Sequence, residues 1–242
     1  MVDASDPMVD ANDTKDLKFS FARFADGFDD HISKSIRGYS GLLDDCVGIS
    51  QYFVEDRSCV VDIGCSSGNL LGKLVKHNRE HAPHASFVGL DVEESFSSQW
   101  KALEALAVQI LVCDVRDYVF PDNCSFVTSI FSLQFIPSRD RLAVMKKVHE
   151  ALRPGGALFI AEKILIENSK IAEIVRSIYF EFKSQHFSES QILAKEQSLR
   201  HQLKPWTETK LLQALEQSGF NPDDISPVWQ NHAFKGYLAI KQ

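Results

Sequence analysis

The residues best suited to chemistry lie in Cys59-Val-Val-Asp-Ile-Gly-Cys-Ser-Ser-Gly68, where an apolar run ends in a loop of small residues. A helical pattern follows from Asn69. Because glycine has no side chain, the backbone at Gly64 and Gly68 can approach a ligand closely, and the first turn of the helix offers unpaired N–H groups beside it. The segment therefore predicts a nucleotide-sized binding site at the end of a strand.

Three aspartates stand where such a site needs hydrogen-bond acceptors. Asp62 lies on the first predicted strand, and Asp91 and Asp114 each end a later strand. In a doubly wound sheet the carboxyl ends of neighbouring strands meet in one crevice, where an acidic residue accepts hydrogen bonds from both ribose hydroxyls. We assign that role to Asp91. We expect Asp114 to accept from an adenine amino group while the N–H of Val115 reads the ring.

Alternating strands and helices must position these residues. Beyond the first strand we predict strands at 86–91, 108–113, 125–131 and 157–162, with Arg153-Pro-Gly-Gly156 as the turn before the last of them. This alternation predicts a mostly parallel sheet with helices on both faces. Two closing strands, at 225–231 and 234–240, are too close in sequence for a crossover helix. They should form a hairpin that sets at least one strand antiparallel.

Two helical segments outside the alternation are expected to form a lid. Residues 18–54 break at Gly38 and Gly41, and Tyr39 at the break can cover the mouth of the site. Residues 168–201 contain the second part of the lid, and a further helix is predicted at 207–217. We treat residues 18–242 as a single domain. Residues 1–17 are rich in Asp and poor in large apolar groups, which predicts a flexible terminus.

The composition narrows the class of protein. A chain of 242 residues that is 44% hydrophobic can bury the core of one α/β domain. The net charge of -7 argues against nonspecific attraction to nucleic acid or to anionic lipid. Five cysteines without a C-x-x-C pair argue against a metal site, and no apolar run reaches membrane-spanning length. We therefore expect a cytoplasmic protein that acts on a small molecule, with neither nucleic acid nor membrane as a direct partner.

The ordered motifs resemble those of the class I S-adenosylmethionine-dependent methyltransferases. The segments that carry the resemblance are Val61-Asp-Ile-Gly-Cys-Ser-Ser-Gly68, Gly89-Leu-Asp91, Cys113-Asp114-Val and Leu152-Arg-Pro-Gly-Gly156. The resemblance implies a Rossmann-like seven-stranded α/β sheet with a helical lid, and S-adenosyl-L-methionine as the cofactor. Our candidate cofactor contacts are Tyr39, Gly64, Cys65, Ser66, Gly68, Asp91, Val92, Asp114 and Val115.

A narrower resemblance, to the carboxy-S-adenosylmethionine synthases, extends from about residue 24 to the C-terminus. The segments that carry it include residues 28–40, Ser132-Leu-Gln-Phe135, Ala161-Glu-Lys163 and Phe187-Ser-Glu with Ile192 and Lys195. That family uses S-adenosylmethionine and prephenate to make the carboxylated sulfonium needed for tRNA wobble-uridine modification, and it works as a homodimer. The resemblance therefore implies a homodimer, which we place at the lid helices.

Two departures from this family bear on the reaction. The family has an arginine just after the lysine that matches Lys195, where it holds the carboxylate of the modified cofactor; this chain has Glu196, which would repel that carboxylate. The family also has an asparagine where this chain has Ile130. Arg200 is a candidate substitute, but we expect an exposed Glu196–Arg200 ion pair, worth about 0.2–0.5 kcal/mol. We rank methylation of a small molecule first, carboxylated-cofactor synthesis second and binding without catalysis third.

Methyl transfer is an in-line displacement that gains rate mainly from alignment, with a base needed only when the nucleophile must lose a proton. Tyr179, Lys183 and His186 repeat at helical spacing and can face the site together, with His186 as the candidate base; the alternative is a solvated helix face. Lys163 is a second, weaker catalytic candidate. The candidate substrate contacts are Gln134, Tyr179, Lys183 and Arg200.

The loop Gly64-Cys-Ser-Ser-Gly68 also matches the nucleophile elbow of hydrolases, with Ser66 as the nucleophile. A hydrolase would place this strand later in the sheet and would need an oxyanion loop upstream, which the sequence lacks. We therefore favour Ser66 as a residue of the cofactor loop. The loop is not the Gly-x-Gly-x-x-Gly of nicotinamide enzymes, so a dehydrogenase ranks well behind.

Overall fold

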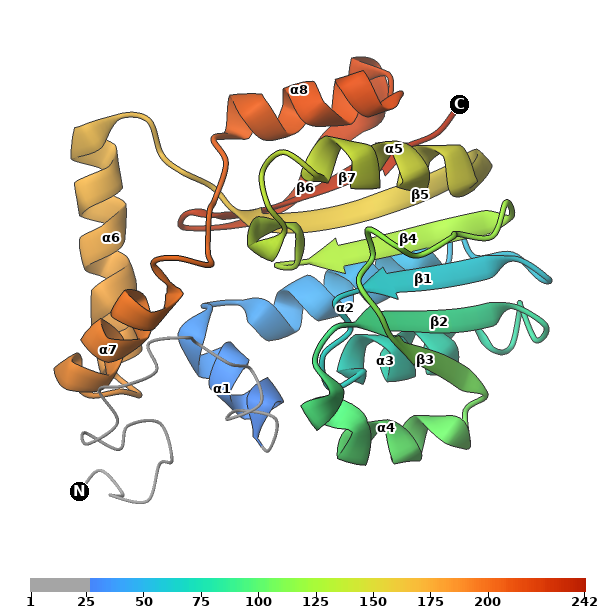
Figure 1. Ribbon diagram of the computed structural model, residues 1–242, viewed down its shortest axis with the longest axis horizontal. Coiled ribbons are helices and arrows are strands. Elements are labelled where there is room, and N and C mark those ends of the chain that lie inside the picture. Colours follow the sequence, from blue (N-terminus) through green and yellow to red (C-terminus); the bar gives the residue numbers. More distant parts are fainter. Residues whose placement is uncertain (1–26) are drawn as a thin grey trace.

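A seven-stranded sheet forms the centre of the molecule. The computed structural model describes residues 27–242, so the predicted terminus at 1–17 and the start of the predicted lid segment lie outside the described residues. The strand order is β3-β2-β1-β4-β5-β7-β6 (Figure 1). The strands are β1 (Cys59–Ile63), β2 (Ser86–Asp91), β3 (Val108–Val112), β4 (Cys124–Ile130), β5 (Leu152–Lys163), β6 (Ile225–Asn231) and β7 (Phe234–Ile240). Strands β1 to β5 are parallel and β7 is antiparallel to both neighbours, which confirms the predicted hairpin.

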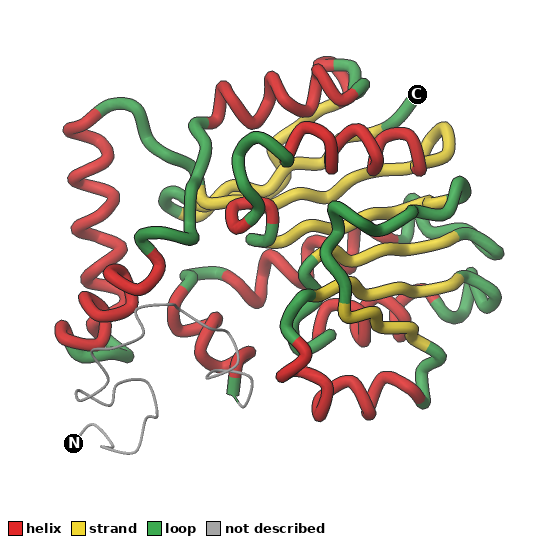
Figure 2. The backbone as a smooth tube through the Cα atoms, in the orientation of Figure 1, coloured by secondary structure: helices red, strands yellow, loops and turns green. Residues whose placement is uncertain are grey.

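Helices surround the sheet and extend beyond one end of it (Figure 2). The α-helices are α1 (Phe28–Ser35), α2 (Tyr39–Ser50), α3 (Asn69–Asn78), α4 (Ser97–Glu104), α5 (Arg141–Ala151), α6 (Ser169–Ser184), α7 (Glu189–Leu199) and α8 (Glu208–Ser218). Short 3-10 helices are η2 (Glu94–Phe96), η3 (Leu133–Phe135) and η4 (Pro222–Asp224). The break between α1 and α2 falls at Gly38, with φ of 79°, while Gly41 lies inside α2.

The core consists of two apolar layers, one on each face of the sheet. Alternate residues of a strand point to opposite faces, so Val61 and Ile63 of β1 pack with α5 and α8, whereas Val60 packs with α2 and α3. All five residues of β1 are buried, as expected for a central parallel strand. Helix α2 belongs to the second layer through its buried residues Leu42, Leu43 and Cys46, so it covers the sheet instead of acting only as a lid.

The segment Arg153–Gly156 is not the turn that the sequence predicted. Strand β5 already begins at Leu152, which pairs with Cys124 of β4, and regular pairing resumes after a register shift at Ala157. Gly155 takes the left-handed conformation with φ of 78°, and a Cβ on Gly156 would lie only 3.0–3.1 Å from three backbone carbonyl oxygens. Glycine therefore permits an irregularity inside a continuous strand, and the prediction that the strand starts at residue 157 was wrong.

Three helices stand at the carboxyl end of the parallel strands. Figure 1 shows α6 and α7 side by side and set apart from the sheet, with α1 between them and the strand ends. We call α1, α6 and α7 the lid helices. Because parallel strands bring their carboxyl ends to one edge, this arrangement encloses the loops that follow β1, β2 and β4.

Removing the ring of Phe126 should reveal how much the second core layer contributes to stability. Phe126 is 0% exposed and stacks on Phe53 with ring centroids 5.8 Å apart. We expect Phe126→Ala to lower the free energy of unfolding by about 3–5 kcal/mol, because a cavity replaces a large buried ring. The control Val119→Ala, at a side chain 85% exposed, should change it by less than about 0.5 kcal/mol. Equal urea midpoints for the two variants would contradict this assignment of the core.

Candidate functional site

A cavity of about 670 Å³ lies between the strand ends and the lid helices. Its size is that of small-molecule and cofactor sites, which span about 300–1,000 Å³. Residues of the loops after β1, β2, β3 and β4 line one side, and residues of α1, α6 and α7 line the other. Eight of the nine predicted cofactor residues line this cavity, and Gly68 does not. The predicted substrate and catalytic candidates Gln134, Lys163, Tyr179, Lys183 and Arg200 line it as well.

The loop between β1 and α3 has the conformation that its small residues permit. Gly64, Ser66 and Gly68 have positive φ angles of 73°, 48° and 78°. A Cβ on Gly64 would lie 2.2 Å from Oγ of Ser132, so a larger residue would push the loop out of place. The N–H of Gly64 donates to the carbonyl of Leu90 over 2.7 Å, which joins the loop to β2.

Ser66 stabilises the conformation of this loop and is not the nucleophile of a hydrolase elbow. Its N–H donates to Oδ2 of Asp91 over 2.8 Å, and its hydroxyl contacts the Gly64 carbonyl at 3.4 Å. The carbonyl of Ser66 accepts from the indole N–H of Trp100 over 2.7 Å, which ties the loop to α4. Each polar group of Ser66 thus takes part in holding the backbone of the loop.

Asp91 is oriented by the backbone on both sides of its carboxylate. Oδ2 accepts from Ser66, and Oδ1 accepts from the N–H of Glu93 over 2.9 Å. Burial raises the pKa of Asp91 above its usual value, and these backbone hydrogen bonds oppose that rise. A carboxylate has about four acceptor positions, so Asp91 keeps acceptor capacity for the ribose hydroxyl that the sequence predicts there. Val92, the next residue, is exposed and also lines the cavity.

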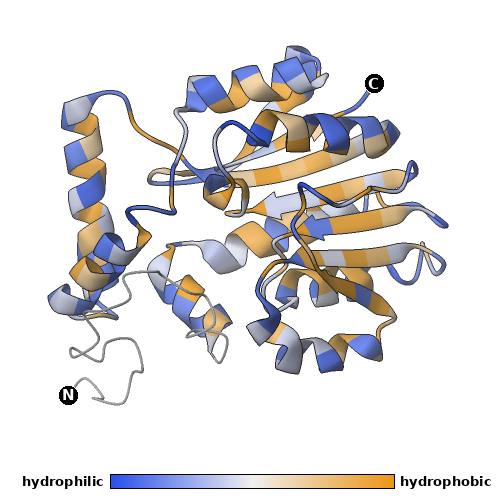
Figure 3. Ribbon diagram, in the orientation of Figure 1, coloured by the Kyte–Doolittle hydropathy of each residue, from blue (hydrophilic) through white to orange (hydrophobic). Residues whose placement is uncertain are grey.

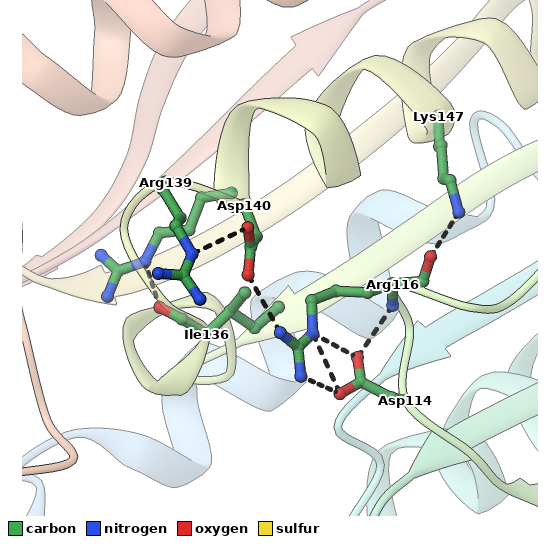
Figure 4. Close-up of polar contacts among 7 residues, drawn as sticks. Asp114, Arg116, Ile136, Arg139, Asp140 and Lys147 are labelled. Carbon is green, nitrogen blue, oxygen red and sulfur yellow. Dashed lines mark hydrogen bonds and ion pairs between the residues drawn. The ribbon is translucent and has the colours of Figure 1, made fainter.

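Asp114 is held by an arginine that the sequence analysis missed. Figure 4 shows Arg116 reaching back to Asp114, with Nε 3.0 Å from both carboxylate oxygens and Nη2 2.7 Å from Oδ2. Nη1 of the same guanidinium bonds Asp140 over 2.9 Å, which connects the loop after β3 to the start of α5. The Arg116 hydrogen bond lowers the pKa of Asp114, which therefore stays an acceptor.

Tyr39 and Asp62 close the inner side of the cavity. The carboxyl of Asp62 accepts from Thr128 over 2.6 Å, and burial raises its pKa to about 7. Burial also raises the pKa of Tyr39, so that its hydroxyl stays protonated and can donate a hydrogen bond. Both residues line the cavity beside the β1 loop.

Of Tyr179, Lys183 and His186, which were predicted to share one face of α6, only the first two face the cavity. Tyr179 and Lys183 line the cavity, but His186 lies beyond the last residue of α6, Ser184, and is exposed. The ring of His186 contacts Phe182 at 5.6 Å instead. Helical spacing stops at the end of the helix, so a residue seven positions after Tyr179 no longer repeats its direction. His186 is therefore not placed to act as a base in this cavity.

Three lysines reach the lid side of the cavity from different elements. Nζ of Lys163 lies 5.6 Å from the centre of the Tyr179 ring, and Nζ of Lys183 lies 4.9 Å from it. Burial lowers the pKa of Lys163, lowers that of Lys183 to about 8, and lowers that of Lys195 to about 7. Lys195 is also hydrogen-bonded to Nε2 of His31 on α1. The role of His31 was not visible in the sequence, because α1 and α7 are far apart along the chain.

Glu196 does not pair with Arg200. Its carboxylate bonds Nη2 of Arg176, on α6, over 3.1 Å. The predicted Glu196–Arg200 pair within α7 was therefore wrong, because the packing of α6 against α7 offers Glu196 a cation from another helix. Arg200 is exposed at the end of α7 and lines the cavity separately.

Gln134 is engaged by the protein backbone. Its Nε2 donates to the carbonyl of Phe131 over 3.1 Å, and its Oε1 accepts from the N–H of Lys163 over 3.1 Å. Nearby, Glu162 accepts from the N–H of Leu133 over 3.0 Å, and burial raises the pKa of this carboxyl to about 8. These contacts join the loop after β4 to the end of β5, so Gln134 shapes the cavity wall more than it offers free polar groups to a substrate.

The fold and this site together define a class I S-adenosylmethionine-dependent transferase. The glycine loop after β1, the oriented carboxylate of Asp91 and the end of the third strand at Asp114 all lie at one cavity, as the predicted S-adenosylmethionine site requires. Residues 60–156 match the family described as a methyltransferase domain. Two solved structures share the fold, each with a TM-score of 0.59. Human N-acetylserotonin methyltransferase in complex with SAM is 14% identical, and the match covers 91% of this chain and 55% of that one. Haemonchus contortus phosphoethanolamine N-methyltransferase 2 in complex with S-adenosyl-L-methionine is 15% identical, and the match covers 86% of this chain and 53% of that one.

Sequence comparison narrows the family. The chain is 34% identical over 229 residues to the carboxy-S-adenosyl-L-methionine synthase of Staphylococcus epidermidis, which covers 92% of this chain and 96% of the relative. It is 29% identical to the synthase of Vibrio atlanticus, over 92% of this chain and 93% of that relative. The chain belongs to the carboxy-S-adenosyl-L-methionine synthase family, and it is an S-adenosylmethionine-dependent enzyme of the transferase class. No helix among residues 27–242 is long and apolar enough to cross a membrane.

Replacing Asp91 tests the cofactor site. We expect Asp91→Ala to weaken S-adenosylmethionine binding at least about tenfold in calorimetry, because it removes the carboxylate predicted to accept from ribose and leaves the N–H groups of Ser66 and Glu93 without their partner. The control Asp223→Ala removes an exposed carboxylate far along the chain in η4 and should leave the affinity unchanged. An Asp91→Ala protein that folds and binds as tightly as the unmodified one would contradict this site.

Proposed function

We propose that this enzyme converts S-adenosylmethionine into its carboxylated derivative, the product that the names of its relatives state. The observation that carries the proposal is the Arg176–Glu196 ion pair. Glu196 would repel a carboxylate if it stood alone, but the guanidinium of Arg176 lies 3.1 Å away and offsets its charge. The departure at position 196 is thus compensated from the neighbouring helix.

The charge of the lid side supports the same proposal. Among residues 27–242, five cationic side chains line the cavity there, against the single carboxylate of Glu196: Lys163, Lys183, Lys195, Arg176 and Arg200. A carboxylate attached to the sulfonium would be attracted to this side, because charges interact strongly where protein replaces water. S-adenosylmethionine supplies the methyl carbon that becomes carboxylated.

The group transfer balances with prephenate as the donor that the family resemblance implies. The carboxyl carbon of the donor bonds to the methyl carbon, which loses one proton. The donor breaks its bond to that carboxyl group and expels its ring hydroxyl as hydroxide, which takes up the proton. The products are the carboxylated sulfonium, an aromatic keto acid and water.

Methylation of a small organic molecule is the second candidate. It is favoured by Ile130 and Glu196, which replace an asparagine and an arginine of the family pattern. In that reaction the lid would need only to align the acceptor with the methyl carbon. The two reactions differ in their sulfur-containing product, since methylation leaves S-adenosylhomocysteine.

Mass spectrometry of the sulfur-containing product distinguishes the candidates. With S-adenosylmethionine and prephenate supplied together, we expect a new sulfonium that carries one carboxyl group in place of one hydrogen. Arg176→Gln should lower its rate of formation at least about tenfold with little change in cofactor affinity, because Glu196 then faces the carboxylate without a partner. Arg139→Gln, at an exposed arginine outside the cavity lining, is the matched control. Absence of the new sulfonium at saturating cofactor would reject the proposal, and S-adenosylhomocysteine formed with an acceptor would favour methylation.

We also propose that two copies associate through the lid helices, as the family resemblance implies. Helix α6 exposes isoleucines at positions 171, 174 and 178, and α7 exposes Leu193. Figure 3 shows hydrophobic bands alternating with hydrophilic ones along α6. Exposed apolar groups gathered on one element are typical of an interaction surface.

Light scattering after size exclusion tests this association. We expect the mass of a dimer for the unmodified protein and of a monomer for Ile174→Glu, because a charge in an apolar interface is costly. The control Val119→Glu carries the same new charge at an exposed valine outside the lid and should remain dimeric. A monomeric unmodified protein would refute the proposal.

A further inference from the structure

The loop after β4 bends sharply where it reaches the cavity. Phe131 has a φ of 56°, a left-handed backbone conformation that is unfavourable for a residue with a large side chain. Its N–H donates to the carbonyl of Ala161 over 2.7 Å, and its carbonyl accepts from Nε2 of Gln134 over 3.1 Å. The hydroxyl of Ser132 donates back to the carbonyl of Ile130 over 3.2 Å. A bend of this kind persists only where neighbouring groups fix it.

The bend affects the cofactor loop because it brings Ser132 against Gly64. Oγ of Ser132 lies 2.2 Å from the place that a Cβ on Gly64 would take. On its other side, the N–H of Gly64 donates to the carbonyl of Leu90 at the end of β2. The loop after β1 is therefore confined between the end of β2 and the loop after β4. A shift of Ser132 would change the space in which the cofactor loop lies.

A buried glutamate holds the N–H side of the bent loop. Glu162, in β5, is 5% exposed, and its Oε1 accepts from the N–H of Leu133 over 3.0 Å. Burial raises the pKa of Glu162 to about 8, and the charge of Arg141 together with the N–H groups of residues 132–134 opposes that rise. A carboxyl group retains an acceptor oxygen in either protonation state, so this contact does not require the ionised form.

A buried arginine holds the carbonyl side of the same loop. Arg141, the first residue of α5, is 2% exposed. Its Nη2 donates to the carbonyl of Gln134 over 2.9 Å, and its Nε donates to that of Ile136 over 2.8 Å. The carbonyl of Gln134 also accepts from the N–H of Lys204, in the segment that follows α7, over 3.1 Å. Neither Arg141 nor Glu162 lines the cavity, so both reach a ligand only through the loop.

We propose that Glu162 and Arg141 are positioning residues for the cofactor site, which act by fixing the loop after β4 in the bend that places Ser132 against Gly64. The two side chains bind the donors and the acceptors of one short segment from behind the cavity wall. Leaving such buried backbone groups unpaired is unfavourable, so the segment moves when either side chain is removed. The inference concerns binding of S-adenosylmethionine and does not depend on which group the enzyme transfers.

Calorimetry with S-adenosylmethionine tests the role of Glu162. Glu162→Leu replaces the carboxyl with an apolar group and should weaken binding at least about tenfold, because the N–H of Leu133 loses its acceptor and the bend relaxes. Glu162→Gln keeps an acceptor oxygen at the same distance along the side chain and should retain most of the affinity. The matched control Glu208→Leu removes a carboxylate that bonds Lys235 and Tyr237 outside the cavity lining. It should lower the Tm and leave the affinity unchanged.

Two further comparisons test the route through the loop. Arg141→Met keeps the apolar stem and should also weaken S-adenosylmethionine binding at least about fivefold, whereas Arg139→Met, at a side chain that is 85% exposed, should not. The losses of affinity in Glu162→Leu and Ser132→Gly should be less than additive in the double variant. Both changes release Gly64 from the same constraint, and residues that act through one contact are coupled.

The positioning role is overturned by undiminished affinity in Glu162→Leu, by an equal loss in Glu162→Gln, or by fully additive losses in the double variant with Ser132→Gly. A lower Tm with unchanged affinity would assign Glu162 to the stability of the fold alone. If Glu162→Leu does not fold, the pair Arg141→Met and Arg139→Met provides the comparison. Failure of the cofactor site itself looks different, since Asp91→Ala would then bind S-adenosylmethionine as tightly as the unmodified protein.

Discussion

The approach of the β1 loop to the ends of β2 and β4 is the contact on which the rest of the site depends. Gly64 must lie where a Cβ would collide with Ser132, and the Ser66 N–H must reach the carboxylate of Asp91. These two conditions place the loop, orient the acidic residue and set the direction in which α3 starts. The cavity exists because parallel strands deliver β1, β2 and β4 to the same edge, where the lid helices cover what the loops leave open.

The two sides of the cavity carry charged groups of opposite sign. On the sheet side, carboxylates accept hydrogen bonds and are stabilised by backbone N–H groups and by Arg116. On the lid side, ammonium groups are brought together under burial that disfavours their charge. The Arg176–Glu196 pair lies among the lid cations and limits the effect of the Glu196 carboxylate.

Much of the fold could be predicted from the sequence because the strands are short, apolar and separated by clear breaks. The strand at 86–91 and the hairpin of 225–231 and 234–240 have the predicted bounds. The Arg153–Gly156 segment could not be assigned correctly, since the same Pro-Gly-Gly residues suit a turn or an irregular strand, and only pairing with β4 and with the C-terminal residues selects the strand. Helix α2 was predicted as part of the lid, but its packing in the second core layer places it against the sheet.

By itself, the sequence determined the parallel sheet, the cofactor loop and the spacing of Asp91 and Asp114, because these depend on local patterns of apolar, small and acidic residues. Only the tertiary structure decided the partners of charged side chains in the lid. Arg176 reaches Glu196 across two helices, His31 reaches Lys195 from the other end of the chain, and His186 falls outside the cavity because α6 ends before it. Which charged groups pair depends on their distance in the folded protein and on their burial, and the spacing of residues along one helix determines neither.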